Sequence, residues 1–256
     1  DMIYLMKQFR TGITEIFPSS SEQRMVARLV ALTTIISLSE LLIARFFSFL
    51  IMPTEGANSS NLTFLSIIFL SIFGVLRVIN YGKEYYRLNV FEKALVERDG
   101  ANNFANSWRW AAAMELTSLL ALCGRWLFIT ALLFWFSWIF GFITFLVGVL
   151  IFNIFSIQMR RQYILQKNFI DLRNDKIKVS NALKVKTRVL AGELGSLASA
   201  FGLLLLFATL IFLNADAAIT PSVAFTLFIA VRMLGQMYSG FSSGLMRYVR
   251  ARVYYA

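Results

Sequence analysis

The sequence predicts an all-α, polytopic membrane protein with six transmembrane helices. Of its 256 residues, 58% are hydrophobic, the mean hydropathy is +0.66, and only three are proline. Apolar runs of about twenty residues recur along the chain, which is the length that crosses a bilayer as a helix. A soluble core of this size could not bury so much apolar surface, so we expect one polytopic domain over residues 1–256.

The elements follow from apolar periodicity and from the residues that interrupt it. Residues 2–17 alternate apolar and charged positions at helical spacing, which is typical of an elbow helix lying on a membrane surface. Pro18 ends this helix, and Ser19 with Glu22 has the spacing of a capping box that begins the next one. The predicted spanning helices cover residues 24–52, 62–97, 107–138, 140–169, 182–213 and 221–255.

Two short connections are predicted in more detail. Phe140, Gly141 and Phe142 are placed at a turn too tight for a loop, between the third and fourth spanning helices. Thr220 and Pro221 supply an N-cap and a first-turn proline for the sixth spanning helix.

The basic residues predict the orientation of the chain. All but three of the 25 Lys and Arg residues lie near the two ends of the chain or around two long connections, and the three opposite loops contain none. By the positive-inside rule, both termini and both connections are cytoplasmic. The helices beside these connections keep a helical alternation of apolar and charged residues past the apolar run, so residues 62–97 would be about 50 Å long and extend well past the bilayer. The net charge of +11 is therefore expected to face anionic membrane lipid, and nucleic-acid binding is not expected.

The residues suited to catalysis are sparse. The chain has no His, which is the commonest metal ligand and general base, and its single cysteine, Cys123, lies in an apolar run. We therefore predict no catalytic residue and no metal site, and we expect the chain not to be an enzyme. An integral membrane transferase or hydrolase, a passive channel and a structural subunit of a membrane complex remain as alternatives.

Three charged residues are predicted near the bilayer midplane. Counted from the outer helix ends, Arg232, Arg125 and Glu40 lie about 17 to 20 Å deep. Arg45 lies close enough to the outer surface to reach water. A pair between Glu40 and one arginine would fix helix packing. One carboxylate cannot neutralise two arginines, so the surplus charge predicts a cavity that accepts an anionic group of a substrate.

Three segments carry a resemblance to a known family: the bends RDGANNFANS and DLRNDKIKVSNALKVKTRVLAGE, and the final helix ITPSVAFTLFIAVRMLGQMYSGFSSGLMRYVRAR. With the elbow helix and six spans, they make the whole chain resemble the transmembrane domain of an ABC exporter. Glu40 is similar to a residue of the members that handle lipid-linked saccharides or peptides. The resemblance implies transport by alternating access, with the two cytoplasmic hairpins acting as levers.

The resemblance also implies roles for two groups of residues. The hairpin bends would couple to ATPase domains through Asp99, Asn102, Asn103, Asp171, Arg173, Asn174 and Asp175, with a short coupling helix within residues 171–180. A ladder of small residues in the last span would either pack within one subunit or close a dimer gate: Gly235, Ser239, Gly240, Ser243 and Gly244.

The chain contains no phosphate-binding loop of the type G-x-x-x-x-G-K-[ST]. The resemblance therefore implies that ATP and Mg²⁺ are bound by a nucleotide-binding domain that is either a separate protein or removed from this chain, and that this chain binds no cofactor. The expected partners are that ATPase domain, a second transmembrane domain in a homo- or heterodimer, and membrane lipid. The expected location is a bacterial inner membrane.

Overall fold

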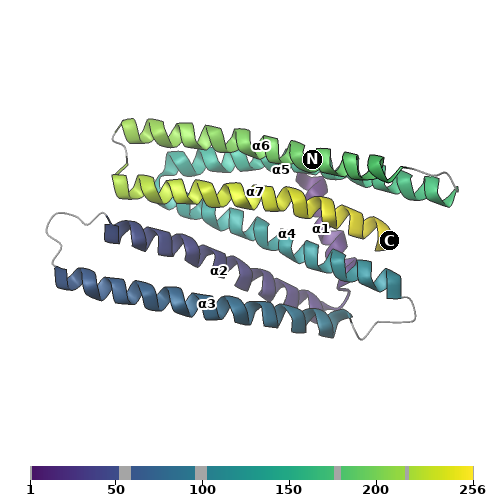
Figure 1. Ribbon diagram of the computed structural model, residues 1–256, viewed down its shortest axis with the longest axis horizontal. Helices are drawn as coiled ribbons and strands as arrows, with labels where there is room; N and C mark the ends of the chain where they lie inside the picture. The colour runs from purple at the N-terminus through teal and green to yellow at the C-terminus, as the bar shows by residue number, and fades with distance from the viewer. Residues whose placement is uncertain (1, 52–58, 96–102, 176–179, 217–218, 256) are drawn as a thin grey trace.

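The computed structural model describes residues 2–51, 59–95, 103–175, 180–216 and 219–255, and these residues contain seven α-helices and no strand (Figure 1). The helices are α1 (Met2–Ile16), α2 (Ser20–Ile51), α3 (Ser59–Leu95), α4 (Asn103–Phe136), α5 (Trp138–Asn174), α6 (Asn181–Ala215) and α7 (Pro221–Tyr255). The six helices from α2 to α7 are long and apolar enough to cross a membrane, so the predicted multi-pass helical architecture is confirmed. Their ends lie within five residues of the predicted bounds.

The centre of the bundle is formed by α4 and α7, which share the most extensive interface. α5 and α6 cover one side of this pair, and α2 and α3 lie on the other (Figure 1). An aromatic cluster joins α5 to α7, with the ring centroids of Phe152 and Phe241 5.0 Å apart and those of Phe155 and Phe241 5.3 Å apart. In contrast, the most apolar stretch of α3 has no buried residue, because α3 packs almost entirely on α2.

The N-terminal helix α1 crosses the long helices steeply, as Figure 1 shows. Its apolar face is buried in the bundle through Leu5, Phe9 and Ile16, and the Phe9 ring lies 6.1 Å from that of Tyr248 on α7. A helix before Pro18 was predicted and is present. Its location on a membrane surface stays a prediction.

Two helix starts have the predicted caps. The backbone N–H of Ser19 donates to Glu22 Oε2 (3.3 Å), and the backbone N–H of Val223 donates to Thr220 Oγ1 (3.4 Å). Local polar side chains satisfy the free backbone groups of the first turn, so sequence spacing is enough to place these ends.

The predicted turn at Phe140–Phe142 is wrong, because these residues lie inside α5. The chain reverses at Ser137, whose Oγ accepts a hydrogen bond from the backbone N–H of Phe140 (3.4 Å). Gly141 has another purpose, since a Cβ atom there would lie 2.6 Å from the backbone of Phe134. The glycine allows α4 and α5 to approach closely beside the turn.

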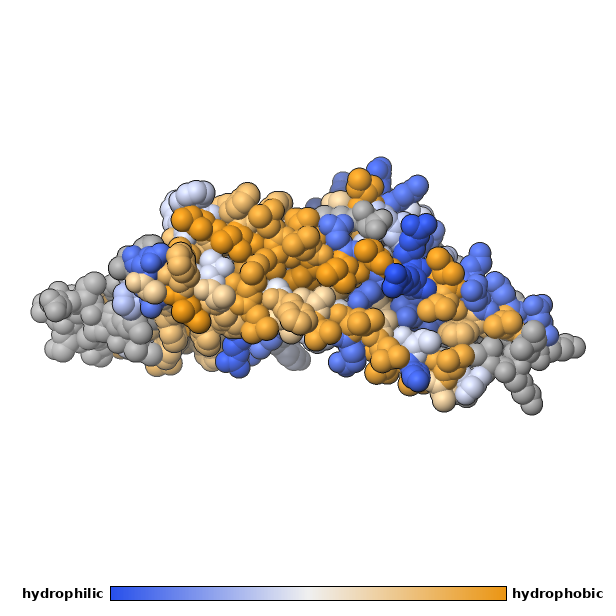
Figure 2. All heavy atoms as spheres, turned by 90° about the horizontal axis from the view of Figure 1, so that it is seen from above, coloured by the Kyte–Doolittle hydropathy of each residue, from blue (hydrophilic) through white to orange (hydrophobic). Residues whose placement is uncertain are grey.

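Hydrophobic side chains cover much of the face shown in Figure 2, and hydrophilic ones gather toward the end where α5 finishes and α6 begins. At this end α5 carries Arg160, Arg161 and Lys167, and α6 carries Lys186, all of them exposed. The molecule therefore has an apolar part long enough for a bilayer and a charged end beyond it.

Candidate functional site

The structure brings Glu40 and Arg125 together at the interface of α2 and α4. Arg125 Nη2 lies 3.4 Å from Glu40 Oε2 and donates a hydrogen bond to it. The Arg125 side chain is 16% exposed and that of Glu40 56%. Because each residue lies well inside a predicted span, the ion pair reduces the cost of placing both charges in the membrane.

Close packing of the backbones supports this pair. A Cβ atom at Gly124 would lie 2.6 Å from Thr34 Oγ1, so α2 and α4 meet there without room for a side chain. Thr34 Oγ1 also lies 3.5 Å from the carbonyl oxygen of Ala121. The α2–α4 interface is therefore tightly packed directly beside Arg125.

Arg232 is not part of this pair. Its side chain is exposed on α7, and within the described part of the chain it makes no hydrogen bond or ion pair. Gln236, Ser239 and Ser243 are also exposed and follow Arg232 at steps of four, three and four residues, which places them on one side of the helix. We call Arg232, Gln236, Ser239 and Ser243 the polar face of α7. It begins about 17 Å from the start of the helix, at the depth of the bilayer interior.

Arg45 lies in the last two turns of α2, and its charge is held within the bundle. Arg45 Nη1 donates to Ser222 Oγ (2.8 Å) and to Thr226 Oγ1 (3.4 Å), both on α7. Its guanidinium also lies 5.6 Å from the centroid of the Phe136 ring. This residue joins α2, α4 and α7 at one end of the bundle.

The glycines predicted as a packing or gate ladder contact other helices of the same chain. A Cβ atom at Gly235 would lie 2.7 Å from Leu203 Cδ1 of α6, and one at Gly244 would lie 3.3 Å from Leu119 Cδ2 of α4. A Cβ atom at Gly240 would lie 3.9 Å from Leu122 Cδ1 of α4. Their positions favour packing within one subunit, whereas Ser239 and Ser243 remain on the polar face.

Two ion-pair groups at the charged end were not predicted. Arg247 of α7 makes two hydrogen bonds to Glu115 of α4, at 2.6 and 3.2 Å. Arg252 is 3.1 Å from Glu15 Oε2 and also donates to the side chain of Gln8, so it joins α7 to α1. The partners are far apart in sequence, and no local spacing indicates them.

The predicted coupling residues lie at or beyond the helix ends of the charged side. Asp171, Arg173 and Asn174 belong to the last turn of α5, so that part of the predicted separate coupling helix is wrong. Asp175 follows directly, with its backbone N–H bonded to the carbonyl of Asp171 (3.0 Å). Asn103 is the first residue of α4, and Asp99 and Asn102 lie outside the described residues.

No protein-family model matches the chain, and no curated protein matches it significantly. Among the described residues there is also no group of three His, Cys, Asp or Glu side chains that could hold a metal ion. The candidate site therefore consists of the Glu40–Arg125 pair, the polar face of α7 and the charged helix ends.

Proposed function

We propose that the chain is the transmembrane part of an ATP-driven exporter, which forms the path of the substrate by alternating access. The observation that carries this proposal is the excess length of the helices at the charged end. α3 and α5 each have 37 residues, or about 55 Å, whereas a bilayer core is about 30 Å thick. A passive channel or a structural subunit gives no reason for extensions of this length.

The two connected pairs α3–α4 and α5–α6 would act as levers. Each pair presents its extended ends on the same side of the bundle as the basic residues of α5 and α6. By the positive-inside rule we place this side in the cytoplasm of a bacterial inner membrane. ATPase domains bound there would rock the helices between inward-open and outward-open states when they close on ATP.

The polar face of α7 would border the substrate path. A charged side chain that faces lipid in the bilayer interior costs several kcal/mol on most scales, roughly 2.5 or more. Arg232 is exposed and has no partner in the described part of the chain, so it is expected to face water, an anionic cargo group or a second subunit. We infer a dimer whose two copies enclose the path and present one Arg232 each to an anionic substrate.

A crosslinking experiment tests the lever model. Asp175 and Asp216 are both exposed aspartates that directly follow long helices, at opposite ends of the bundle. In a Cys123→Ser background, Asp175→Cys is expected to crosslink to an ATP-hydrolysing subunit in native membranes, and Asp216→Cys is the matched control. The adduct is identified by mass spectrometry and by its labelling with an azido-ATP analogue.

The lever model places the ATPase contact at one end of the bundle only, the end that carries residue 175. Crosslinking of an ATP-labelled protein through residue 175 and not through residue 216 supports it. Equal reaction at both positions, or no ATP-labelled adduct at either, contradicts the assignment to an ATP-driven transporter.

A further inference from the structure

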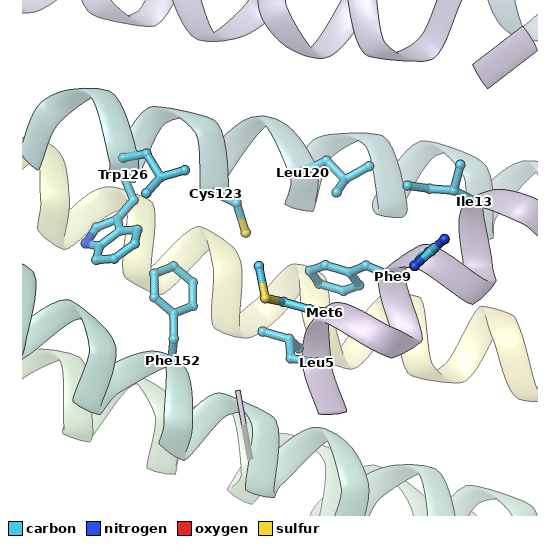
Figure 3. Close-up of a pocket in the computed structure, with 10 residues that line it drawn as sticks. Leu5, Met6, Phe9, Ile13, Leu120, Cys123, Trp126 and Phe152 are labelled. Carbon is cyan, nitrogen blue, oxygen red and sulfur yellow. The ribbon is translucent and has the colours of Figure 1, made fainter. Parts of the chain in front are cut away.

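An apolar cavity of about 310 Å³ lies between α1, α4 and α5 (Figure 3). This volume is at the lower end of the range of about 300–1,000 Å³ that small-molecule sites occupy. Figure 3 shows Leu120, Cys123 and Trp126 of α4 along one side of the cavity, and side chains of α1 and Phe152 of α5 on the side that faces them. The floor consists of residues that are no more than 5% exposed: Leu5, Phe9, Trp126 and Phe152.

The rim of the cavity consists of exposed side chains, in contrast to the buried floor. Met6 of α1 is 62% exposed and Leu127 of α4 is 56% exposed, and both line the cavity. Leu120 to Leu127 lie within a stretch of α4 that is long and apolar enough to cross a membrane, so in a bilayer this rim would meet the hydrocarbon. A molecule can therefore enter from the membrane without crossing water.

The chemistry of the lining suits an alkyl chain with an anionic end. Among the described residues that line the cavity, Arg10 is the one with a charge, and it is exposed on α1. The remaining walls are apolar apart from the weakly polar thiol of Cys123. A polar solute would lose its hydrogen bonds to water there without replacement, which is unfavourable. An acyl chain loses none, and Arg10 complements a phosphate.

We propose that this cavity binds one acyl chain of an anionic phospholipid, with the headgroup phosphate against Arg10. Basic residues beside spanning helices bind anionic headgroups in general, and each cation near such a surface contributes a favourable attraction. The buried floor gives the acyl chain a fixed place that a flat lipid-facing helix surface lacks. The inference requires only that the chain lies in a membrane, so it stands apart from the transport proposal.

The single cysteine of the chain reports on the cavity, because Cys123 lines it. The full chain is reconstituted into vesicles of phosphatidylcholine alone or with added phosphatidylglycerol. The rate at which N-ethylmaleimide alkylates Cys123 is then measured. Phosphatidylglycerol is expected to slow alkylation. In Arg10→Gln, the concentration of phosphatidylglycerol that gives half of the full protection should rise about fivefold. This factor corresponds to the attraction of one cation to an anionic surface.

Lys7→Gln is the matched control, because Lys7 is an exposed cation of α1 that does not line the cavity. It should keep the protection of the unchanged chain. Native mass spectrometry gives a second readout that does not need a reactive thiol: Arg10→Gln should lose bound phosphatidylglycerol, and Lys7→Gln should retain it.

Three results would overturn the proposal. The first is that phosphatidylglycerol does not change the alkylation rate of Cys123 and is retained no more than phosphatidylcholine in native mass spectrometry. The second is an equal loss in Lys7→Gln and Arg10→Gln, which would indicate general surface attraction. The third is equal protection by inorganic phosphate, which would indicate an anion site without an acyl chain.

Discussion

Arg125 and Arg232 carry the same charge at similar predicted depth, yet the regions around them differ. At the α2–α4 interface, Arg125 is 16% exposed and its Nη2 lies 3.4 Å from Glu40 Oε2. On the polar face of α7, Arg232 is exposed and makes no ion pair with any residue that the structure describes. A paired charge inside the bundle contributes to packing. A charge left on the surface of a spanning helix needs water, a ligand or another subunit.

The surroundings of each residue support the same distinction. α2 and α4 approach closely at Gly124, where a Cβ atom would meet Thr34. The polar face of α7 has small side chains at Ser239 and Ser243, both exposed. Depth in the membrane therefore identifies charged residues of interest, and packing separates those that hold the structure from those available to bind.

The largest effect is expected when Glu40 becomes positive. Glu40→Arg would place two arginines together at the α2–α4 interface, and breaking such a pair is expected to cost about 3–5 kcal/mol where it is buried, less here because Glu40 is half exposed. Most of the purified protein should then aggregate. The measurement is the monodisperse fraction in detergent together with the thermal unfolding midpoint.

The exchanged pair Glu40→Arg with Arg125→Glu should restore the monodisperse fraction, because the charges remain complementary. The combination of Glu40→Arg with Arg232→Glu is the control and should not restore it. Rescue by Arg232→Glu alone would contradict the pairing in the structure and would make Arg232 the structural arginine.

Much of the helical architecture follows from the sequence because hydropathy and local caps determine it. Apolar runs of spanning length predict the six long helices. The caps at Ser19 and Thr220 are also predictable, because each is a hydrogen bond between residues only three positions apart. The reversal at Ser137 was missed because no Gly or Pro marks it. The turn was placed at Gly141 because glycine is common in turns, but this glycine instead allows close contact with Phe134.

The site was predictable only in part. Depth along each helix identified Glu40, Arg125 and Arg232, but the choice of partner depends on how each helix is rotated about its axis. Arg247 and Glu115 are 132 residues apart, so only the packing of α4 on α7 brings them together. Helix rotation and crossing are properties of the assembled bundle, which a single sequence does not state.

An intermediate effect is expected at Arg232, and on activity rather than stability. Arg232→Gln should change the unfolding free energy by less than about 0.5 kcal/mol, as for other exposed positions. The variant would lose the charged hydrogen bond from Arg232 to the anionic substrate, and such a bond contributes about 1.5–3 kcal/mol. This loss should lower substrate-stimulated ATP hydrolysis of the reconstituted complex roughly 10- to 100-fold. Arg125→Gln is the control and should mainly lower stability. If Arg232→Gln unfolds the protein while activity per folded molecule is unchanged, the charge is structural.

The smallest effect separates two neighbouring serines of α7. Ser242 is 2% exposed and donates from Oγ to the carbonyl of Gly192 on α6 (3.2 Å), where a Cβ at Gly195 would meet the same Oγ. Ser243 is exposed, and within the part of the chain that the structure describes its Oγ donates only to the carbonyl of Gly240 in its own helix (3.1 Å). Ser242→Ala should therefore lower the unfolding free energy by about 1 kcal/mol, whereas Ser243→Ala should change it by less than about 0.5 kcal/mol.

Both values can be measured by denaturant titration in mixed micelles, at protein concentrations low enough to keep single chains. Repeating the titration at high protein concentration sharpens the comparison, because a loss at Ser243 that appears only there would show that a second copy covers the polar face. A loss at Ser243 equal to that at Ser242 in single chains would instead mean that this face is buried within one subunit, and the distinction between the two regions would fail.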